Sequence, residues 1–284
     1  MRGEGASGLL LMLAAALAFA VMAAAGKQAG HDMPILAVAF WRSFGSFILL
    51  LPFAVVGRTA WRIADKKGLL LRALSGTAAM GCYFWTLAHL PLAEALLWSH
   101  SSPVFTTLIA WWQLGERPRR RTLMGLALAL AGIWGLLRPD LGTVGSASLV
   151  GLAGGGFAGL AYTQVRALRH EPTWGVVLGF MGVASLLLAP AAAHTAFRGV
   201  PGSTWAWLVV AAVSATIAQG LMTAGYRRAP AGPASVAQMT AVLHAAWLGS
   251  CGFGESLVPG RWSAALALLV GCLLAAWPTR VPEA

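Results

Sequence analysis

The chain alternates between long apolar runs and short polar connections, with charge, proline or glycine at the run boundaries. Runs of about 20 apolar residues have the length of a helix that crosses a bilayer. The pattern predicts ten transmembrane helices, at 7–27, 34–56, 68–88, 91–114, 121–138, 147–168, 174–196, 203–225, 230–253 and 261–278. The predicted fold class is an all-α membrane protein.

The two halves of the chain carry one pattern at a constant offset. Residues 91–134 match 230–273 without a gap, so that Pro91 falls on Pro230 and Gly132 on Gly271. Because each half contains an odd number of spans, the second half must enter the bilayer from the opposite side. We therefore predict two inverted five-helix repeats, 1–140 and 141–284, an arrangement typical of alternating-access transporters.

Lysine and arginine are divided unequally between alternate connections. With the N-terminus inside, the cytoplasmic segments hold 15 of these residues, Arg72 among them, and the opposite side holds 4. Cytoplasmic connections retain positive charge, so both termini are predicted to lie in the cytoplasm.

The first apolar run is also typical of a signal peptide, because Arg2 precedes it and small residues end it. Glu4 cancels the charge of Arg2, however, and the run has a counterpart at the start of the second half. We interpret it as a retained first span.

Composition supports a membrane protein and excludes several other classes. Apolar residues make up 58% of the chain and charged residues 10%, against about a quarter charged in soluble domains. The net charge of +11 does not indicate nucleic acid, because all basic residues except Arg42 lie in the connections or at their borders. Cys82, Cys251 and Cys272 lie inside apolar runs without metal spacing and are interpreted as packing residues. No metal or cofactor is predicted.

Several short segments carry a family resemblance. They are Phe40-Trp41-Arg42, Leu90-Pro91-Leu92-Ala93, Ser102-Pro103, Leu114-Gly115-Glu116-Arg117, the stretch from Gln219 to Tyr226-Arg227, Ala229-Pro230 and Phe253-Gly254-Glu255. In this order and duplication, the chain resembles the drug/metabolite transporter superfamily, in particular its ten-span EamA-type permeases.

That resemblance implies a bacterial inner-membrane permease for small metabolites, often amino acids, and commonly an exporter. Some members of this type take up larger, ring-containing metabolites. One departure is that Pro103 meets Val242 in the second half, so the second half is expected to bend differently.

Charged side chains inside the spans are the first candidates for a substrate site, because they are costly in a bilayer. Arg42 lies well within the second span and cannot lose its proton, so it is predicted to bind a substrate carboxylate or act in a gate. Glu94, near the outer end of the fourth span, is predicted to face the cavity and exchange a proton. The alternatives are a permanent ion pair between the two residues, or a solvated Glu94.

Glu94 also begins a helical stripe with Trp98, Ser101 and Phe105. The equivalent second-half positions are Pro233, Ala237, Thr240 and His244. Indole, hydroxyl and imidazole groups suit a wet cavity with an apolar wall, so Trp98, Ser101, Thr240 and His244 are predicted substrate-binding residues. The alternative is that Trp98 packs between helices and the hydroxyls bond to their own helices.

Three further polar side chains are predicted to bind substrate: Tyr83, Tyr162 and Gln219. Interhelical hydrogen bonding is the alternative for each of them. His100 and His244 lie in mid-span, where they could couple transport to protons or serve as hydrogen-bonding partners.

The sequence shows no paired carboxylates, no nucleophile with its base and no phosphate-binding glycine loop, so neither an enzyme nor an ATP-driven pump is predicted. We predict a secondary-active transporter in the bacterial inner membrane, whose partners are a small-molecule substrate and the lipid bilayer. The expected substrate is an amino acid or a related zwitterionic or aromatic compound, and the expected direction is export. Uptake of a larger ring-containing metabolite, a lipid flippase and a structural membrane protein remain alternatives.

Overall fold

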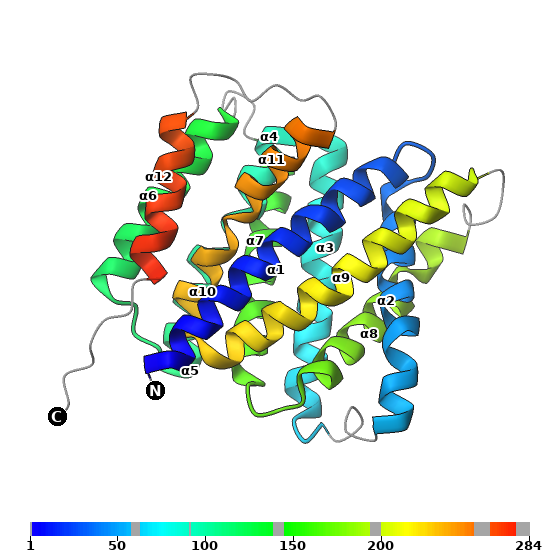
Figure 1. Ribbon diagram of the computed structural model, residues 1–284, viewed down its shortest axis with the longest axis horizontal. Helices are drawn as coiled ribbons and strands as arrows, with labels where there is room; N and C mark the ends of the chain where they lie inside the picture. The colour runs from blue at the N-terminus through cyan, green and yellow to red at the C-terminus, as the bar shows by residue number, and fades with distance from the viewer. Residues whose placement is uncertain are drawn as a thin grey trace.

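The computed structural model describes residues 2–57, 63–90, 92–138, 145–193, 200–252 and 262–276. Within these ranges the chain forms twelve α-helices and no strand (Figure 1). The helices are α1 (Arg2–Ala29), α2 (Ile35–Gly57), α3 (Lys66–His89), α4 (Leu92–Ser99), α5 (Ser102–Leu114), α6 (Arg120–Leu137), α7 (Ser146–Ala167), α8 (Thr173–Ala193), α9 (Gly202–Arg228), α10 (Ala231–Gln238), α11 (Ala241–Gly252) and α12 (Trp262–Ala276). The all-helical fold class is confirmed for the described part of the chain.

Each predicted span coincides with helical structure, but two of them are not single helices. Run 91–114 contains α4 and α5, and run 230–253 contains α10 and α11. Within the described residues, five helices, α1, α2, α6, α8 and α9, are long and apolar enough to cross a membrane by length and composition. The count of ten spans and the side on which the termini lie stay predictions.

The two repeats run in opposite directions through the bundle. A Cβ at Gly8, near the start of α1, would lie 2.9 Å from the backbone nitrogen of Ala229. Near the end of α7, Arg166 donates to the carbonyl of Arg227 at 3.0 Å. The beginning of one repeat's first helix and the end of the other's therefore meet at the turn between α9 and α10. We call this end of the bundle the lower end, and the opposite end, with the α1–α2 connection, the upper end (Figure 1).

Helix packing follows an approximate two-fold symmetry between the repeats. Helix α1 packs along α9 and α3 along α7, while α2 packs on α8 and α6 on α12. Exchanging the repeats converts the α1–α9 pair into the α7–α3 pair, and it leaves the α2–α8 and α6–α12 pairs unchanged. Small residues permit the closest approaches: a Cβ at Gly132 on α6 would lie only 2.7 Å from the Cα of Leu268 on α12.

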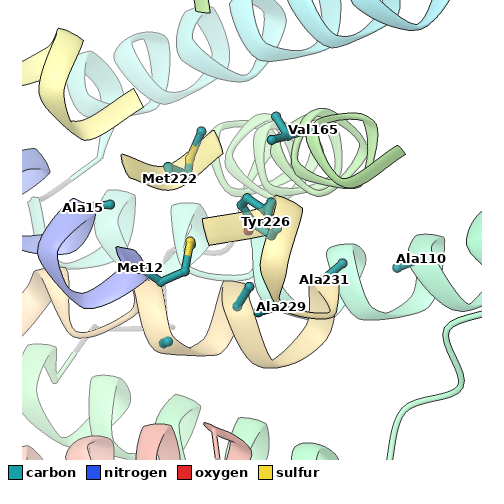
Figure 2. Packing of buried hydrophobic residues seen from close by; sticks show 10 residues of the cluster. Met12, Ala15, Ala110, Val165, Met222, Tyr226, Ala229 and Ala231 are labelled. Carbon is teal, nitrogen blue, oxygen red and sulfur yellow. The ribbon is translucent and has the colours of Figure 1, made fainter. Parts of the chain in front are cut away.

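The symmetry fails at the two ends of the bundle, because among the described residues the two ends are packed differently. At the lower end α5 packs on α10, and a Cβ at Gly232 would lie 3.2 Å from the Thr107 hydroxyl oxygen. A buried cluster lies at this end of the bundle (Figure 2): Met12, Ala15, Ala110, Val165, Met222, Tyr226, Ala229, Ala231, Ala234 and Ala237. The equivalent helices at the upper end, α4 and α11, form no comparable packing among their described residues.

Candidate functional site

Two broken helices mark the middle of the bundle. Helix α4 ends at Ser99 and α5 begins at Ser102; α10 ends at Gln238 and α11 begins at Ala241. These ends are equivalent positions of the two repeats. Transporters bind substrates at discontinuous helices of this kind, where helix ends and freed backbone groups face the repeat interface.

Equivalent side-chain hydrogen bonds form at both breaks. The Ser101 hydroxyl donates to the carbonyl of Trp98 at 2.6 Å, and the Thr240 hydroxyl donates to the carbonyl of Ala237 at 2.8 Å. Each carbonyl also accepts from the backbone N–H of the same serine or threonine, at 3.1 and 3.3 Å, in place of the N–H four residues further along that a continuous helix would supply. The structure thus contains the hydrogen bonds within one helical segment that were the alternative to substrate binding for these two hydroxyls. Their role as substrate ligands stays a prediction.

Proline does not determine where the second break falls. Pro103 occupies the first turn of α5, which suits a residue without an N–H. Its counterpart Val242 does have a backbone N–H, which donates to the carbonyl of Met239 at 3.1 Å. The second half breaks at the equivalent position without the proline.

The predicted cavity stripe on α4 and α5 faces helix α7. A Cβ at Gly151 would lie 2.7 Å from the Trp98 Cβ, and Gly159 faces Phe105 in the same way. The Trp98 side chain remains partly exposed. The side chain of Glu94 lies outside the described part of the structure, so its predicted role is not addressed.

Arg42 on α2 is buried, with 8% of its surface exposed. Its guanidinium donates to the Met80 sulfur at 2.8 Å, the Met22 sulfur at 3.1 Å and the Ser43 hydroxyl at 3.4 Å. Thioether sulfur is a weak acceptor, and the Arg42 Nε has no partner. Among the described side chains, Arg42 forms no ion pair with an acidic group.

The charge count grouped Arg72 with the cytoplasmic segments, although it falls within the predicted span 68–88. It lies inside α3 with only 2% of its surface exposed. Its guanidinium carbon is 4.1 Å from the ring centroid of Phe180 on α8, and its Nη2 donates to the Gln219 side-chain oxygen at 3.2 Å. The absence of a side chain at Gly76 makes room for this arrangement, since a Cβ there would collide with Nη1.

Helix α9 presents a polar stripe toward Arg72. Gln219, Thr223 and Tyr226 recur at helical spacing on one face, and the Tyr226 ring stacks on Tyr162 of α7 with centroids 5.8 Å apart. Both tyrosine side chains lie near Arg72. The structure thus gathers two predicted ligands, Tyr162 and Gln219, around an arginine that the charge count had grouped with the cytoplasmic segments.

Two other predicted ligands lie apart from this cluster. Tyr83 is on α3, three residues beyond Met80, with its ring against Phe84. His244 is in the first turn of α11, and its Nδ1 is buried without a partner. Neither forms a hydrogen bond with Arg42 or Arg72 among the described residues, so their roles stay predictions.

A polar latch holds the lower end closed. Gly115 ends α5 in the left-handed region at φ 68°, where glycine is favoured, and the chain then turns to Glu116. The Glu116 carboxylate accepts from Arg166 Nε and from the backbone N–H of Ala231, each at 2.7 Å. Arg166 also donates to the carbonyl of Tyr226 at 2.9 Å. One ion pair therefore joins the ends of α5 and α7 to the α9–α10 turn.

The fold and this site define a class: helical membrane proteins built from two repeats that run in opposite directions, with buried cationic groups at their interface. The sequence pattern of the EamA-like transporter family matches residues 6–138 and, a second time, residues 145–277. The chain belongs to the EamA-like transporter family. As predicted, it is a member of the drug/metabolite transporter superfamily, a multi-pass membrane transporter by family.

Named relatives agree with that assignment. A pseudopaline exporter of Pseudomonas aeruginosa is 33% identical over 191 residues, which cover 65% of this chain and 66% of the exporter. An uncharacterized transporter of Helicobacter pylori is 26% identical, covering 100% of this chain and 99% of its own. A riboflavin transporter of Brucella anthropi is 26% identical over 78% of this chain and 81% of its own. The family and these relatives indicate a transporter and not an enzyme.

A solved structure shares the fold. It superposes with a TM-score of 0.79 over 95% of this chain and 96% of its own, at 22% sequence identity.

Proposed function

We propose that this protein is a secondary-active exporter of the bacterial inner membrane, with ten spans and both termini in the cytoplasm. It moves a small polar metabolite by alternating access. The observation that carries the proposal is closure of the bundle at one end only: α5 packs on α10, while α4 and α11 form no comparable packing among their described residues.

Because the repeats are inverted, closure at one end of the bundle can be exchanged for closure at the other end. When the repeats exchange conformations, the contacts of α5 with α10 become contacts of α4 with α11, and access moves to the other end. In the proposed orientation the lower end is cytoplasmic, so the structure represents an outward-facing state. The Glu116–Arg166 latch belongs to the cytoplasmic gate of that state.

The expected substrate is an amino acid or a related zwitterionic or aromatic compound. Two buried arginines without acidic partners among the described side chains support a substrate with a carboxylate, because a buried charge needs a counter-charge. The Pseudomonas relative is an exporter, which supports the outward direction. The Brucella relative is a riboflavin transporter, and for this reason uptake of a ring-containing metabolite is the second candidate. Proton coupling through His244 or Glu94 belongs to the same proposal.

Paired cysteines test the exchange of conformations. Thr107→Cys with Gly232→Cys, in a chain whose native cysteines are replaced, joins the lower ends of α5 and α10, since a Cβ at Gly232 lies in contact with Thr107. The equivalent upper-end pair is Ala93→Cys with Ala246→Cys. We expect each disulfide to stop counterflow in proteoliposomes and reduction to restore it, with the two pairs trapping opposite states.

Each trap has its own single-cysteine controls, which must transport normally under the same oxidant. The two states are distinguished by whether a membrane-impermeant maleimide reaches the cavity from outside or from inside. Undiminished transport with the lower pair fully crosslinked would overturn the alternating-access proposal.

A further inference from the structure

We infer that Arg42 and Arg72 together form a two-point site for a substrate with two carboxylate groups, one bound by each guanidinium. The inference rests on the proposed transport function and names its substrate class. It follows from the donors around each arginine, from the spacing of the two arginines, and from the lack of an acidic partner for either.

Arg72 has far more donors than protein acceptors. A guanidinium offers five N–H groups, yet one side-chain oxygen, that of Gln219, accepts from it, at 3.2 Å. The Phe180 ring covers one face of the group, and Nε has no partner although Arg72 is 2% exposed. The remaining donors suit a planar, two-oxygen acceptor such as a carboxylate.

The side chains near Arg72 add further donors. The hydroxyls of Thr223 and Tyr226 have no hydrogen-bond partner, and these residues are 2% and 0% exposed. Both lie on the α9 stripe with Gln219. Unsatisfied buried polar groups are costly and rare, and several hydroxyl donors beside a guanidinium form an environment that stabilises an anion.

A separate acceptor lies close to these donors. Gln238, the last residue of α10 before the break, interacts through its side chain with the Tyr162 hydroxyl. Its Oε1 is buried without a partner. This oxygen can accept a hydrogen bond from a substrate ammonium group, so the site suits an amino dicarboxylate.

Arg42 provides the second cationic point. Its acceptors are the sulfurs of Met22 and Met80 and the hydroxyl of Ser43, which are weak or neutral partners for a guanidinium. The equivalent position in the second repeat is Met181, a buried residue. A methionine is therefore accommodated in the same position of the fold, and Arg42 is not required for helix packing as such.

Helix α3 sets the spacing of the two guanidiniums. The Nη1 of Arg72 lies beside Gly76, and the Nη2 of Arg42 is 2.8 Å from the sulfur of Met80. Gly76 and Met80 are one helical turn apart, roughly 6 Å along the axis. Both guanidiniums therefore lie against adjacent turns of α3, which places them near enough to one another for a single substrate with two carboxylates.

Charge balance distinguishes a dianion from a monoanion. Among the described side chains, neither arginine forms an ion pair, and the second repeat contributes the uncharged Gln219, Thr223 and Tyr226 to the interface. A dicarboxylate neutralises both guanidiniums, whereas a monocarboxylate leaves one charge buried without a counter-ion. The site should therefore select dianions.

Purified full-length protein tests this with glutarate, adipate and glutamate against butyrate and hexanoate, by calorimetry and thermal shift. We expect the dicarboxylates to bind about 100-fold more tightly than monocarboxylates of matched length, the order expected of one added charge-assisted pair. Arg42→Met and Arg72→Gln should each reduce dicarboxylate affinity to the monocarboxylate level. The matched control is Arg169→Gln, at an exposed arginine near the lower end, which should leave both affinities unchanged.

Folding is followed separately, by the melting temperature without ligand. Arg42→Met should not lower it, because the new side chain joins two methionines and no longer buries a charge. Arg72→Lys keeps the charge and should retain part of the dianion preference. Equal affinity for dicarboxylates and monocarboxylates in the wild type would overturn the inference, and so would unchanged dicarboxylate selectivity in well-folded Arg42→Met and Arg72→Gln.

The outcomes separate the inference from the proposed function. Selective dicarboxylate binding without counterflow or alternating crosslinks supports the two-point site and overturns the transport proposal. Counterflow of monocarboxylates at the rate of dicarboxylates overturns the two-point site and supports transport.

Discussion

Replacing Glu116 with glutamine should weaken closure of the lower end without unfolding the protein. Glu116 accepts from Arg166 Nε and from the Ala231 N–H, both at 2.7 Å. A glutamine keeps one acceptor oxygen but loses the negative charge and one of the two bonds. The α9–α10 turn is then held to α5 and α7 by fewer contacts, and the lower end opens more often.

The size of the effect follows from these bonds. A hydrogen bond to a charged group contributes about 1.5–3 kcal/mol when buried. The side chains of Arg166 and Glu116 are 14% and 19% exposed, so solvent reduces that value, and we take a net loss of about 2 kcal/mol. This corresponds to a roughly 30-fold larger ratio of open to closed lower ends.

Cysteine accessibility measures that ratio. Thr107→Cys, in a chain without native cysteines, places a thiol at the contact of α5 with Gly232 of α10, where the residue is 3% exposed. A water-soluble maleimide labels it only when the two helices separate, so the labelling rate follows the open fraction. We expect Glu116→Gln to raise this rate about 30-fold, in line with the free-energy change above.

Glu171→Gln is the matched control. Glu171 is at the same end of the bundle and accepts from the backbone N–H of Asp65 at 2.9 Å and of Ala64 at 3.2 Å, and its side chain forms no hydrogen bond with α5 or α10 among the described residues. Its substitution should leave the labelling rate of Thr107→Cys unchanged. A change of less than about threefold in Glu116→Gln, or the same increase in both variants, would refute the latch.

The remaining predictions concern packing and transport. Gly132→Ala should lower the melting temperature and reduce the free energy of unfolding by about 2 kcal/mol, because the added Cβ meets the backbone of Leu268. Gly81→Ala should be neutral or slightly stabilising, because a Cβ there has nothing within 4 Å. Equal melting temperatures of the two variants would contradict this. Arg42→Ala and Trp98→Ala should each abolish counterflow in proteoliposomes while size-exclusion profiles stay those of folded protein. Normal transport by both variants would show that the site assignment is wrong.

Helix positions could be predicted well, because apolar runs and charged boundaries are local features of the sequence. The breaks in the fourth and ninth runs could not. The polar segment 99–102 precedes Pro103, but the run around it still has the length of a single span. The second break has no proline to indicate it. Ser101 and Thr240 bond back to carbonyls of their own segments. Thr77 and Thr216 do the same inside unbroken helices, so such bonding does not mark the breaks either.

The site was predicted only in part, for a related reason. An arginine six residues from the start of a helix is typical of a polar boundary, and Arg72 was counted there. Its burial depends on Phe180 and Gln219, which approach it only when α8 and α9 pack on α3. Glu116 could be recognised as part of a motif, but its function depends on Arg166, 50 residues further along the chain. The roles of Arg72 and Glu116 depend on contacts between the two repeats, and the local sequence of one repeat does not reveal those contacts.

The contact between Trp98 and Gly151 bears on the history of the gene. Its counterpart in the other half joins Ala237 and Met12, both members of the buried cluster at the lower end, so the large residue has changed helix between the two copies. A hypothetical ancestor made of two identical first halves would set an indole against a methionine at both contacts, where neither has room. At this contact the two halves are therefore complementary, and a second copy of the first half could not take the place of the second half without repacking.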